Sequence, residues 1–482
     1  MTPSRRGLLC AGLGAGAGLV SAGGAAIPVA RAETCERPPV GGDWSCDPGA
    51  LRAAASDFGR IIARTPRAVH RPSSRADIAA LLRWASTHGA NVSARGQGHS
   101  IYGRSLAENG IVIDMSAMSA IGEIRPDRVV VEAGATWGAV LDATLAHGLT
   151  PPVLTNYLGL SIGGTIAIGG IGGASSAHGL QTDNVLELDV VTGGGQELTC
   201  SPSAHPDLFD AVRGGLGKCG IVTRATLRLV RAPTQVRRFQ LFYPDLATLM
   251  ADQRRALAER RFDQLQGAVI PDPAGGWRYQ LEGAVFRDGA TSAGDGAVLD
   301  GLSDMRHAAV IAGSTYRDDA HSFAKLRQLL TSNSQWFHPQ PWLLTFLRGS
   351  NALSVARAVL DGLTGADVGP FGRVTCYPMS TTAVRTRQAR LPDEPIVFPF
   401  NLIRIPASDD PASAERMVAQ NRALYDRIRA AGGILYPVSA MPMSSRDWQD
   451  HFGPAWQPLR DAMQRYDPAN ILTPGYDLRD RT

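Results

Sequence analysis

The sequence predicts an α+β protein of two domains, with the second domain inserted into the first. At 482 residues, the chain exceeds one ordinary hydrophobic core. Two glycine-rich loops separate short strands and helices in its first half, and longer strand and helix patterns follow Pro233. Glycine-rich strand and loop structure returns after Gly433. The predicted domains are residues 50–233 together with 433–482, and an inserted domain of residues 234–432.

The first 32 residues have the pattern of an export signal that is removed. Arg5-Arg6 is a twin-arginine pattern, followed by a Gly/Ala-rich apolar run and a small-x-small cleavage site at Ala30-Arg31-Ala32. The glycines make this run a poor spanning helix, so a membrane anchor is the weaker alternative. Ordinary secretion stays open, because the usual Phe and Lys of the motif are missing. We expect a secreted mature chain that starts near Glu33.

Charge gives no reason to expect a nucleic-acid or membrane partner for the mature chain. The formal net charge is +4, and residues 1–32 carry three arginines and no acidic residue, so processing leaves +1. The composition, 44% hydrophobic and 19% charged, is ordinary for a folded protein.

The cysteines predict one disulfide and no metal site. Cys35 and Cys46 bracket a short loop at the mature N-terminus, which favours a disulfide outside the cytoplasm. Cys200, Cys219 and Cys376 have no metal-ligand spacing, and we expect them to be buried.

Short strands and helices alternate in the first predicted domain. Ser73 or Ser74 is expected to cap a helix whose apolar residues recur at helical spacing from Ile78 to Ala85. Thr192-Gly193-Gly194-Gly195 is a hairpin signature. The other predicted strands and helices are strands at 68–72, 91–94, 111–114, 129–133, 185–191, 197–200 and 220–229, and helices at 137–147 and 206–212.

The inserted region and the C-terminus continue the α+β pattern. Predicted strands cover 238–242, 278–285 and 397–405, and predicted helices cover 246–260, 320–330 and 414–431. A last helix ends at Tyr466, and the chain then passes through Asp467-Pro468 to Thr473-Pro474-Gly475.

The first glycine-rich loop, Arg95-Gly96-Gln97-Gly98-His99-Ser100, directly follows a predicted strand. Alternating glycines remove side chains from one edge, so that backbone N–H groups can converge on an anion such as a pyrophosphate. A histidine after the glycines can reach a cofactor held there. The spacing fits neither a Rossmann fingerprint nor a P-loop. These residues alone leave two readings open: an anion-binding loop, or a glycine-rich turn with a surface histidine.

This loop resembles the Arg-Gly-Arg-Gly-His-Ser motif of cytokinin dehydrogenases, which belong to the vanillyl-alcohol oxidase/p-cresol methylhydroxylase family of FAD enzymes and are related to the berberine-bridge enzymes. Several further stretches resemble that family in the same order. They are Tyr157–Thr165, Asn184–Gly193, Asp207-Leu208-Phe209, Gly214–Gly217, Gly220–Ala225 and His451–Gly475. The resemblance covers nearly all of the mature chain, and it implies a PCMH-type FAD-binding fold with an inserted α+β substrate (cap) domain.

The resemblance implies FAD bound covalently through His99, with single attachment because no cysteine lies between Cys46 and Cys200. The implied cofactor-binding residues are Ala94, Arg95, Gly96, Gln97, Gly98, His99, Ser100, Arg104, Ser161, Ile171, Ile221 and Thr473. Three positions depart from the family. Arg104 and Tyr476 each stand where glutamine is usual, and Ala167 stands where a serine would contact the cofactor.

On the substrate side, Asn156 replaces the family's aspartate, which takes a proton from the substrate's secondary amine. An amide can orient an N–H group but cannot accept its proton at ordinary pH. Glu282 matches the family's glutamate at the pocket entrance and is a candidate for substrate recognition or for the missing base; otherwise it is a strand-surface carboxylate. The residues His178, His338 and Tyr436 are further candidates to line the site, with structural roles as the alternative.

The implied function is a secreted FAD-dependent oxidoreductase that transfers hydride from a C–N bond of a cytokinin-like secondary amine to flavin N5. The flavin would then be reoxidised by O2 or a quinone. Two alternatives stay open: an oxidase of another amine, an alcohol or a sugar with the same covalent flavin, or a flavoprotein that binds a small molecule without turnover. We expect no nucleic-acid partner and no membrane association after signal cleavage. The oligomeric state is left open.

Overall fold

The computed structural model describes residues 35–288 and 294–478. The predicted export signal lies outside these residues. The chain divides into Met1–Glu36 and Arg37–Thr482, and the elements below belong to the second unit. Cys35 and Cys46 are each disulfide-bonded, as the predicted pair requires. The other described cysteines, Cys200, Cys219 and Cys376, are buried, as predicted.

A four-stranded sheet carries the first glycine-rich loop at the end of its strand β3 (Val92–Arg95). Its order is β1 (Asp43–Ser45), β2 (Ala68–Arg71), β4 (Ile111–Asp114) and β3. Strands β2 and β3 both run parallel to β4, while β1 is antiparallel to β2. Because parallel neighbours end at one edge of a sheet, the loops that follow them begin there. The glycine-rich loop after β3 therefore starts at this edge.

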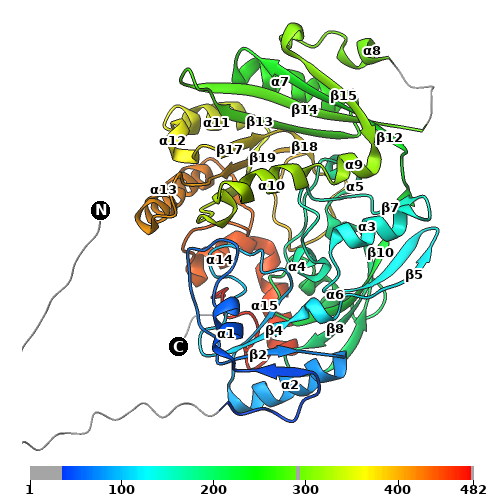
Figure 1. The fold of residues 1–482 in the computed structure, drawn as a ribbon, viewed down its shortest axis with the longest axis vertical. Coiled ribbons are helices and arrows are strands. Elements are labelled where there is room, and N and C mark those ends of the chain that lie inside the picture. The colour runs from blue at the N-terminus through cyan, green and yellow to red at the C-terminus, as the bar shows by residue number, and fades with distance from the viewer. Residues whose placement is uncertain (1–34, 289–293, 479–482) are drawn as a thin grey trace, which may run out of the picture. The chain divides into compact units, whose positions relative to one another are not determined.

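Helix α2 (Arg75–His88) connects β2 to β3 and packs on this sheet (Figure 1). Ser74 caps it by accepting a hydrogen bond from the Asp77 backbone N–H, and Gly89 ends it in the left-handed conformation. The predicted apolar residues, from Ile78 to Ala85, are fully buried. Helix α1 (Pro48–Ala54) precedes β2, and Asp47 caps it.

A second, antiparallel sheet has the order β5 (Ile121–Arg125), β6 (Arg128–Glu132), β10 (Gly220–Arg228), β8 (Val185–Thr192) and β9 (Glu197–Cys200). The predicted hairpin joins β8 to β9. The helices of this region are α3 (Trp137–Leu145), α4 (Ile162–Ile166), α5 (Ser175–His178) and α6 (Pro206–Val212). Strands β7 (Leu149–Thr150) and β11 (Val230–Arg231) form a separate pair.

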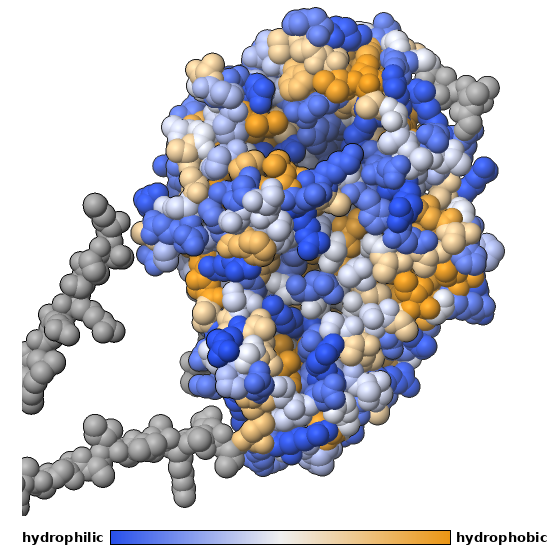
Figure 2. All heavy atoms as spheres, in the orientation of Figure 1, coloured by the Kyte–Doolittle hydropathy of each residue, from blue (hydrophilic) through white to orange (hydrophobic). Residues whose placement is uncertain are grey.

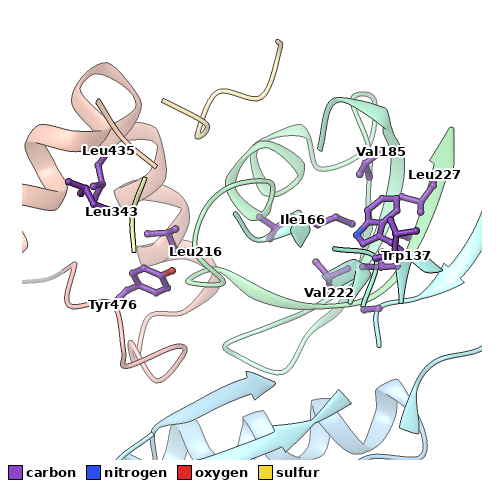
Figure 3. Close-up of a cluster of buried hydrophobic side chains, with 14 of the residues drawn as sticks. Trp137, Ile166, Val185, Leu216, Val222, Leu227, Leu343, Leu435 and Tyr476 are labelled. Carbon is purple, nitrogen blue, oxygen red and sulfur yellow. The ribbon is translucent and has the colours of Figure 1, made fainter. Parts of the chain in front are cut away.

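The buried indole of Trp137 ties α3 to α4, because its Nε1 donates to Thr165 Oγ1 at 2.8 Å. Figure 3 shows Trp137 among Ile166, Val185 and Val222, which come from α4, β8 and β10. This packing fixes α4, which begins one residue after Ser161 of the second glycine-rich loop.

The third sheet has nine strands, and all its pairs are antiparallel. Its strands are β12 (Gln235–Tyr243), β13 (Gln264–Pro271), β14 (Trp277–Arg287), β15 (Val310–Thr315), β16 (Leu343–Arg348), β17 (Arg373–Cys376), β18 (Met379–Ser380), β19 (Ile396–Ile403) and β20 (Ile434–Leu435). This large antiparallel sheet forms the cap, at the top of Figure 1. The domain limits drawn from the sequence stay predictions.

Helices accompany the cap sheet. They are α7 (Leu246–Ala258), α8 (Asp295–Leu299), α9 (Tyr316–Ala320), α10 (Phe323–Ser332), α11 (Ala352–Leu360), α12 (Gly365–Val368) and α13 (Pro411–Ala430). Short 3-10 helices lie at η1 (Met115–Ala117), η2 (Gln181–Asn184), η3 (Arg306–Ala308), η4 (Gln335–Phe337) and η5 (Gly453–Ala455).

After α14 (Ser445–Phe452) and α15 (Trp456–Tyr466), the C-terminal segment returns to the first sheet. The Val92 N–H donates to Ile471 O, and the Thr473 N–H donates to Val92 O, both at 2.8 Å. Buried Asp467 shapes this segment by accepting from the Ile471 and Leu472 backbone N–H groups. Residues 471–473 are thus fixed beside β3, immediately before the first glycine-rich loop.

The face in Figure 2 carries its hydrophobic residues in small groups between hydrophilic ones. Within residues 35–288 and 294–478, no helix is both long and apolar enough to cross a bilayer. In the same residues, no group of three His, Cys, Asp or Glu side chains is arranged to hold a metal ion.

Candidate active site

A cavity of about 520 Å³ lies where the two glycine-rich loops, β10, the C-terminal segment and the cap sheet meet. Nearly all of the predicted site residues line it. They are Ala94, Gly96, Gln97, Gly98, His99, Ser100, Arg104, Asn156, Ser161, Ile171, Ile221, Glu282 and Thr473. The fold therefore brings together residues that lie up to 379 positions apart in the chain.

The two glycine-rich loops touch each other at Gly96. A Cβ added to Gly96 would lie 2.0 Å from the Ser161 Oγ, far inside any van der Waals contact. Gly98 has a φ of +63°, a left-handed conformation that favours glycine. Glycine is thus required at Gly96 because the two loops approach closely, and at Gly98 because the backbone is left-handed there.

Arg95 is the predicted cofactor residue that does not line the cavity. Its guanidinium Nη1 donates to Ser56 O at 2.9 Å, and the rest of the group packs over Gly98. The Arg95 side chain therefore supports the loop from the side of Ser56. A contact of Arg95 with the cofactor through its backbone stays a prediction. The loop carbonyls are held as well, because the Phe58 N–H donates to Gly98 O at 2.8 Å.

His99 is surrounded by aromatic rings that no sequence motif predicted. Its imidazole stacks on Phe58, with ring centroids 3.9 Å apart and planes 18° apart, and Tyr157 and Trp336 are also in contact range. Burial lowers the pKa of His99 to about 4, so the ring is neutral at ordinary pH. Its Nε2 is buried and has no hydrogen-bond partner among residues 35–288 and 294–478. A neutral imidazole nitrogen with a free lone pair is a competent nucleophile.

Asp57 is a buried carboxylate under the loop that the sequence reasoning missed. It accepts hydrogen bonds from Ser100 Oγ at 3.0 Å and from the Gly103 N–H at 2.8 Å. Burial raises the pKa of Asp57 to about 6, in spite of these bonds and the nearby Arg95. No motif surrounds Asp57, so only its contacts across the fold reveal its role in shaping the turn after His99.

Of the two predicted catalytic residues, Asn156 is exposed at the cavity wall, whereas Glu282 is already paired. Arg373 Nη2 donates to Glu282 Oε1 at 2.5 Å, and Gln280 Nε2 donates to the same oxygen at 2.7 Å. A substrate N–H would have to compete with these donors, so the geometry favours recognition over proton abstraction for Glu282. Arg373 was missed because it lies 91 residues away in the sequence.

Tyr436 lines the cavity, whereas His178 and His338 do not. The Tyr436 hydroxyl accepts a hydrogen bond from the Gly170 N–H at 3.0 Å, and burial raises its pKa, so it stays protonated. His338 Nδ1 is bonded to Pro406 O at 2.9 Å, a structural contact. His178 closes the short helix α5.

The cavity is lined by both apolar and polar side chains. The apolar residues include Phe58, Phe323, Leu326, Leu330, Trp336, Trp342 and Phe371. The cap sheet contributes a set of polar residues, called the polar wall below: Gln266, Glu282, Arg373, Thr375 and Asn401. Such a cavity suits a small molecule with a flat apolar part and polar edges.

Two family models match the chain. Residues 66–201 match an FAD binding domain. Residues 278–478 match a model described as cytokinin dehydrogenase 1, FAD and cytokinin binding. The cytokinin dehydrogenase 10 of Oryza sativa subsp. japonica is 35% identical over 482 aligned residues, which cover 90% of this chain and 88% of the relative.

The chain belongs to the cytokinin dehydrogenase family. This confirms the family predicted from the sequence, the mixed α+β fold and the assignment as a FAD-dependent oxidoreductase. A protein of Rhodococcoides fascians, named an uncharacterized oxidoreductase ORF5 in fasciation locus, is 37% identical over 91% of this chain and 99% of its own length. Among solved structures, a chitooligosaccharide oxidase superposes with a TM-score of 0.71 over 90% of this chain and 95% of its own, at 16% identity, and shares the fold.

The residues that line the cavity of this protein fit FAD. The contact between Gly96 and Ser161 leaves the loop edge bare of side chains, as a bound pyrophosphate requires. His99 lines the same cavity, and among the described residues its buried Nε2 has no hydrogen-bond partner. When bound, FAD supplies a two-electron acceptor. The protein supplies the backbone cradle, the aromatic surroundings of His99 and the cap-sheet wall.

The Gly96→Ala variant should lose most of its bound FAD, because its Cβ would collide with Ser161 Oγ. The measurement is flavin content per protein after purification. The matched control is Gly194→Ala in the β8–β9 turn, where a new Cβ meets only Thr192 Oγ1 at 3.8 Å. Full flavin content in Gly96→Ala would show that the two loops do not need this approach.

The Asp57→Asn variant should be more stable than wild type at pH 7.5, by up to about 3 kcal/mol from the size of the pKa shift. Because the pKa of Asp57 is raised in the folded state, its protonated carboxyl contributes fully to the free energy of unfolding below about pH 4. That contribution is lost as the pH rises through 6. The advantage of the neutral variant should therefore vanish near pH 4. Urea unfolding midpoints of both proteins measure this. An advantage that is independent of pH would contradict the role of the charge.

Proposed function

We propose that the protein oxidises a C–N bond of a cytokinin-like secondary amine with FAD and passes the electrons to O2 or a quinone. The observation that carries this proposal is the single cavity in which His99 and the glycine loops face the cap-sheet residue Glu282. The chain's membership of the cytokinin dehydrogenase family supports the proposal. We also propose that the protein works outside the cytoplasm, after removal of residues 1–32, because these residues have an export-signal pattern.

We propose that His99 forms the covalent bond to FAD. The ring is held in place by stacking on Phe58, and burial keeps it unprotonated. In the part of the chain that the structure describes, its Nε2 has no hydrogen-bond partner. These three properties are those that a histidine needs in order to bond to an electrophilic carbon.

Asn156 determines how the substrate's proton leaves. As a hydride moves to flavin N5, the substrate nitrogen becomes more acidic, and its N–H proton must pass to a base. The Asn156 side chain can accept a hydrogen bond from that N–H but not the proton. Because Asn156 is exposed, water beside it is the proton acceptor in this proposal. The products are an imine, a proton released to water and a two-electron-reduced flavin.

The polar wall favours a second candidate function, oxidation of an alcohol or a sugar with the same cofactor. Gln266, Arg373 and Asn401 are side chains that hydrogen-bond hydroxyl groups. A third alternative, binding without turnover, rests on Asn156, an amide that cannot accept the substrate's proton.

The function is tested by anaerobic mixing of the oxidised protein with isopentenyladenine and, separately, with a panel of simple amines, alcohols and oligosaccharides. Loss of the flavin's visible absorption with isopentenyladenine, and slower or no loss with the panel, is the expected result. Bleaching by an alcohol or a sugar alone would favour the second function. A spectral shift without bleaching by any compound would favour binding without turnover.

The Asn156→Asp variant should oxidise the amine faster than wild type near neutral pH, by about ten- to a hundredfold, because a positioned carboxylate is a general base. Its rate should fall as the carboxylate is protonated at low pH, whereas the wild-type rate should lack that acidic limb. The measurement is the rate of anaerobic flavin reduction against pH. Identical pH profiles for the two proteins would exclude Asn156 from the proton path.

A further inference from the structure

Arg104 is a buried cation in the wall of the cavity, five residues after His99. It is 7% exposed. Its Nη1 donates to Gly475 O and its Nη2 to Met441 O, both at 3.0 Å. Both acceptors are neutral carbonyl groups, so they satisfy its N–H groups without cancelling its charge.

Three aromatic rings surround the Arg104 guanidinium. The carbon Cζ lies 5.1 Å from the ring centroid of Tyr476, 5.3 Å from that of Tyr102 and 5.4 Å from that of Trp448. The resemblance noted in the sequence implies glutamine at the positions of Arg104 and Tyr476, and in the structure these two side chains contact each other. The two changes therefore form one local unit.

The charge of Arg104 has no carboxylate partner within ion-pair distance among residues 35–288 and 294–478. Burial lowers the pKa of the Arg104 guanidinium, and Tyr476 and Tyr102 act against this effect. The smaller effects of Arg64 and Asp57 oppose each other. In addition, Arg104 Nε is buried without a hydrogen-bond partner. A guanidinium keeps its proton in proteins, and a buried charge is costly unless another charge compensates it. Arg104 lines the cavity, so a negatively charged group bound there would add to the compensation that Asp57 gives.

We propose that Arg104 stabilises the negative charge that the flavin acquires when it accepts a hydride. Hydride transfer brings two electrons and one proton to the bound cofactor and leaves it anionic. Inside a protein, opposite charges attract over many ångströms, so the effect does not require contact. The inference rests on FAD binding and not on the proposed amine substrate. Arg104 thus raises the flavin's tendency to accept electrons from any donor.

The test compares Arg104→Gln, which keeps a donor but removes the charge, with Arg104→Lys, which keeps the charge. In Arg104→Gln, the two-electron reduction equilibrium should weaken about tenfold or more, which is a drop of about 30 mV in midpoint potential. Binding of sulfite, whose flavin adduct is also anionic, should weaken by a similar factor. Arg104→Lys should stay near wild type in both measurements. Tyr476→Phe, which removes only a hydroxyl, is the control for local disturbance.

Unchanged potential and sulfite affinity in folded, flavin-loaded Arg104→Gln would overturn the proposal, as would equal losses in both variants. A measurement on the wild type alone covers the case in which the variants do not fold. Titrated with acid, its reduced flavin should keep the spectrum of the anion at least about one pH unit below free reduced FAD in the same buffer, which corresponds to about 1.4 kcal/mol. Protonation at the same pH as free reduced FAD would contradict the proposal.

Discussion

The close contact between Gly96 and Ser161 is the constraint on which the rest of the site depends. It brings two loops, which follow β3 and precede α4, within a distance that excludes any side chain. The C-terminal segment supports the first loop through its two hydrogen bonds with Val92, and the indole of Trp137 supports the second through Thr165. Elements from both ends of the chain therefore hold the two glycine-rich loops together. His99 belongs to the first of these loops.

Burial gives the charged and titratable groups around these loops their properties. His99 is neutral because desolvation lowers its pKa, while the pKa of Asp57 is raised for the same reason. Arg104 stays charged and is surrounded by carbonyl groups and rings. The neutral His99 and the charged Arg104 thus line one cavity. A neutral nucleophile suits the attachment of a cofactor, and a fixed cation suits a cofactor that becomes anionic each time it is reduced.

The sequence predicted elements that local patterns determine. The cap at Ser74, the apolar stripe of α2 and the β8–β9 hairpin were all found where their patterns placed them. The motif residues predicted for the cofactor line one cavity, apart from Arg95, whose long side chain turned to the opposite face of the loop. Local spacing cannot reveal to which side of a tight loop a flexible side chain turns.

What the sequence did not predict depends on contacts between distant segments. The pairing of Glu282 with Arg373 arises because β14 and β17 flank β13, and no local pattern encodes that order. Strands β13, β15, β16 and β17 were missed for the same reason, since short strands in a wide sheet are defined by their neighbours. His99 is surrounded by the rings of Phe58, Tyr157 and Trp336, which come from three separate segments.

The central claim is that the first glycine-rich loop binds FAD and that His99 is its covalent tether. The most direct measurement is acid precipitation of the purified protein, followed by proteolysis and mass spectrometry of the flavin-bearing peptide. The account predicts that the yellow flavin stays with the precipitate, that the modified peptide contains His99, and that His99→Ala releases all flavin to the supernatant. Flavin found entirely in the wild-type supernatant, or attached to a peptide without His99, would contradict the account.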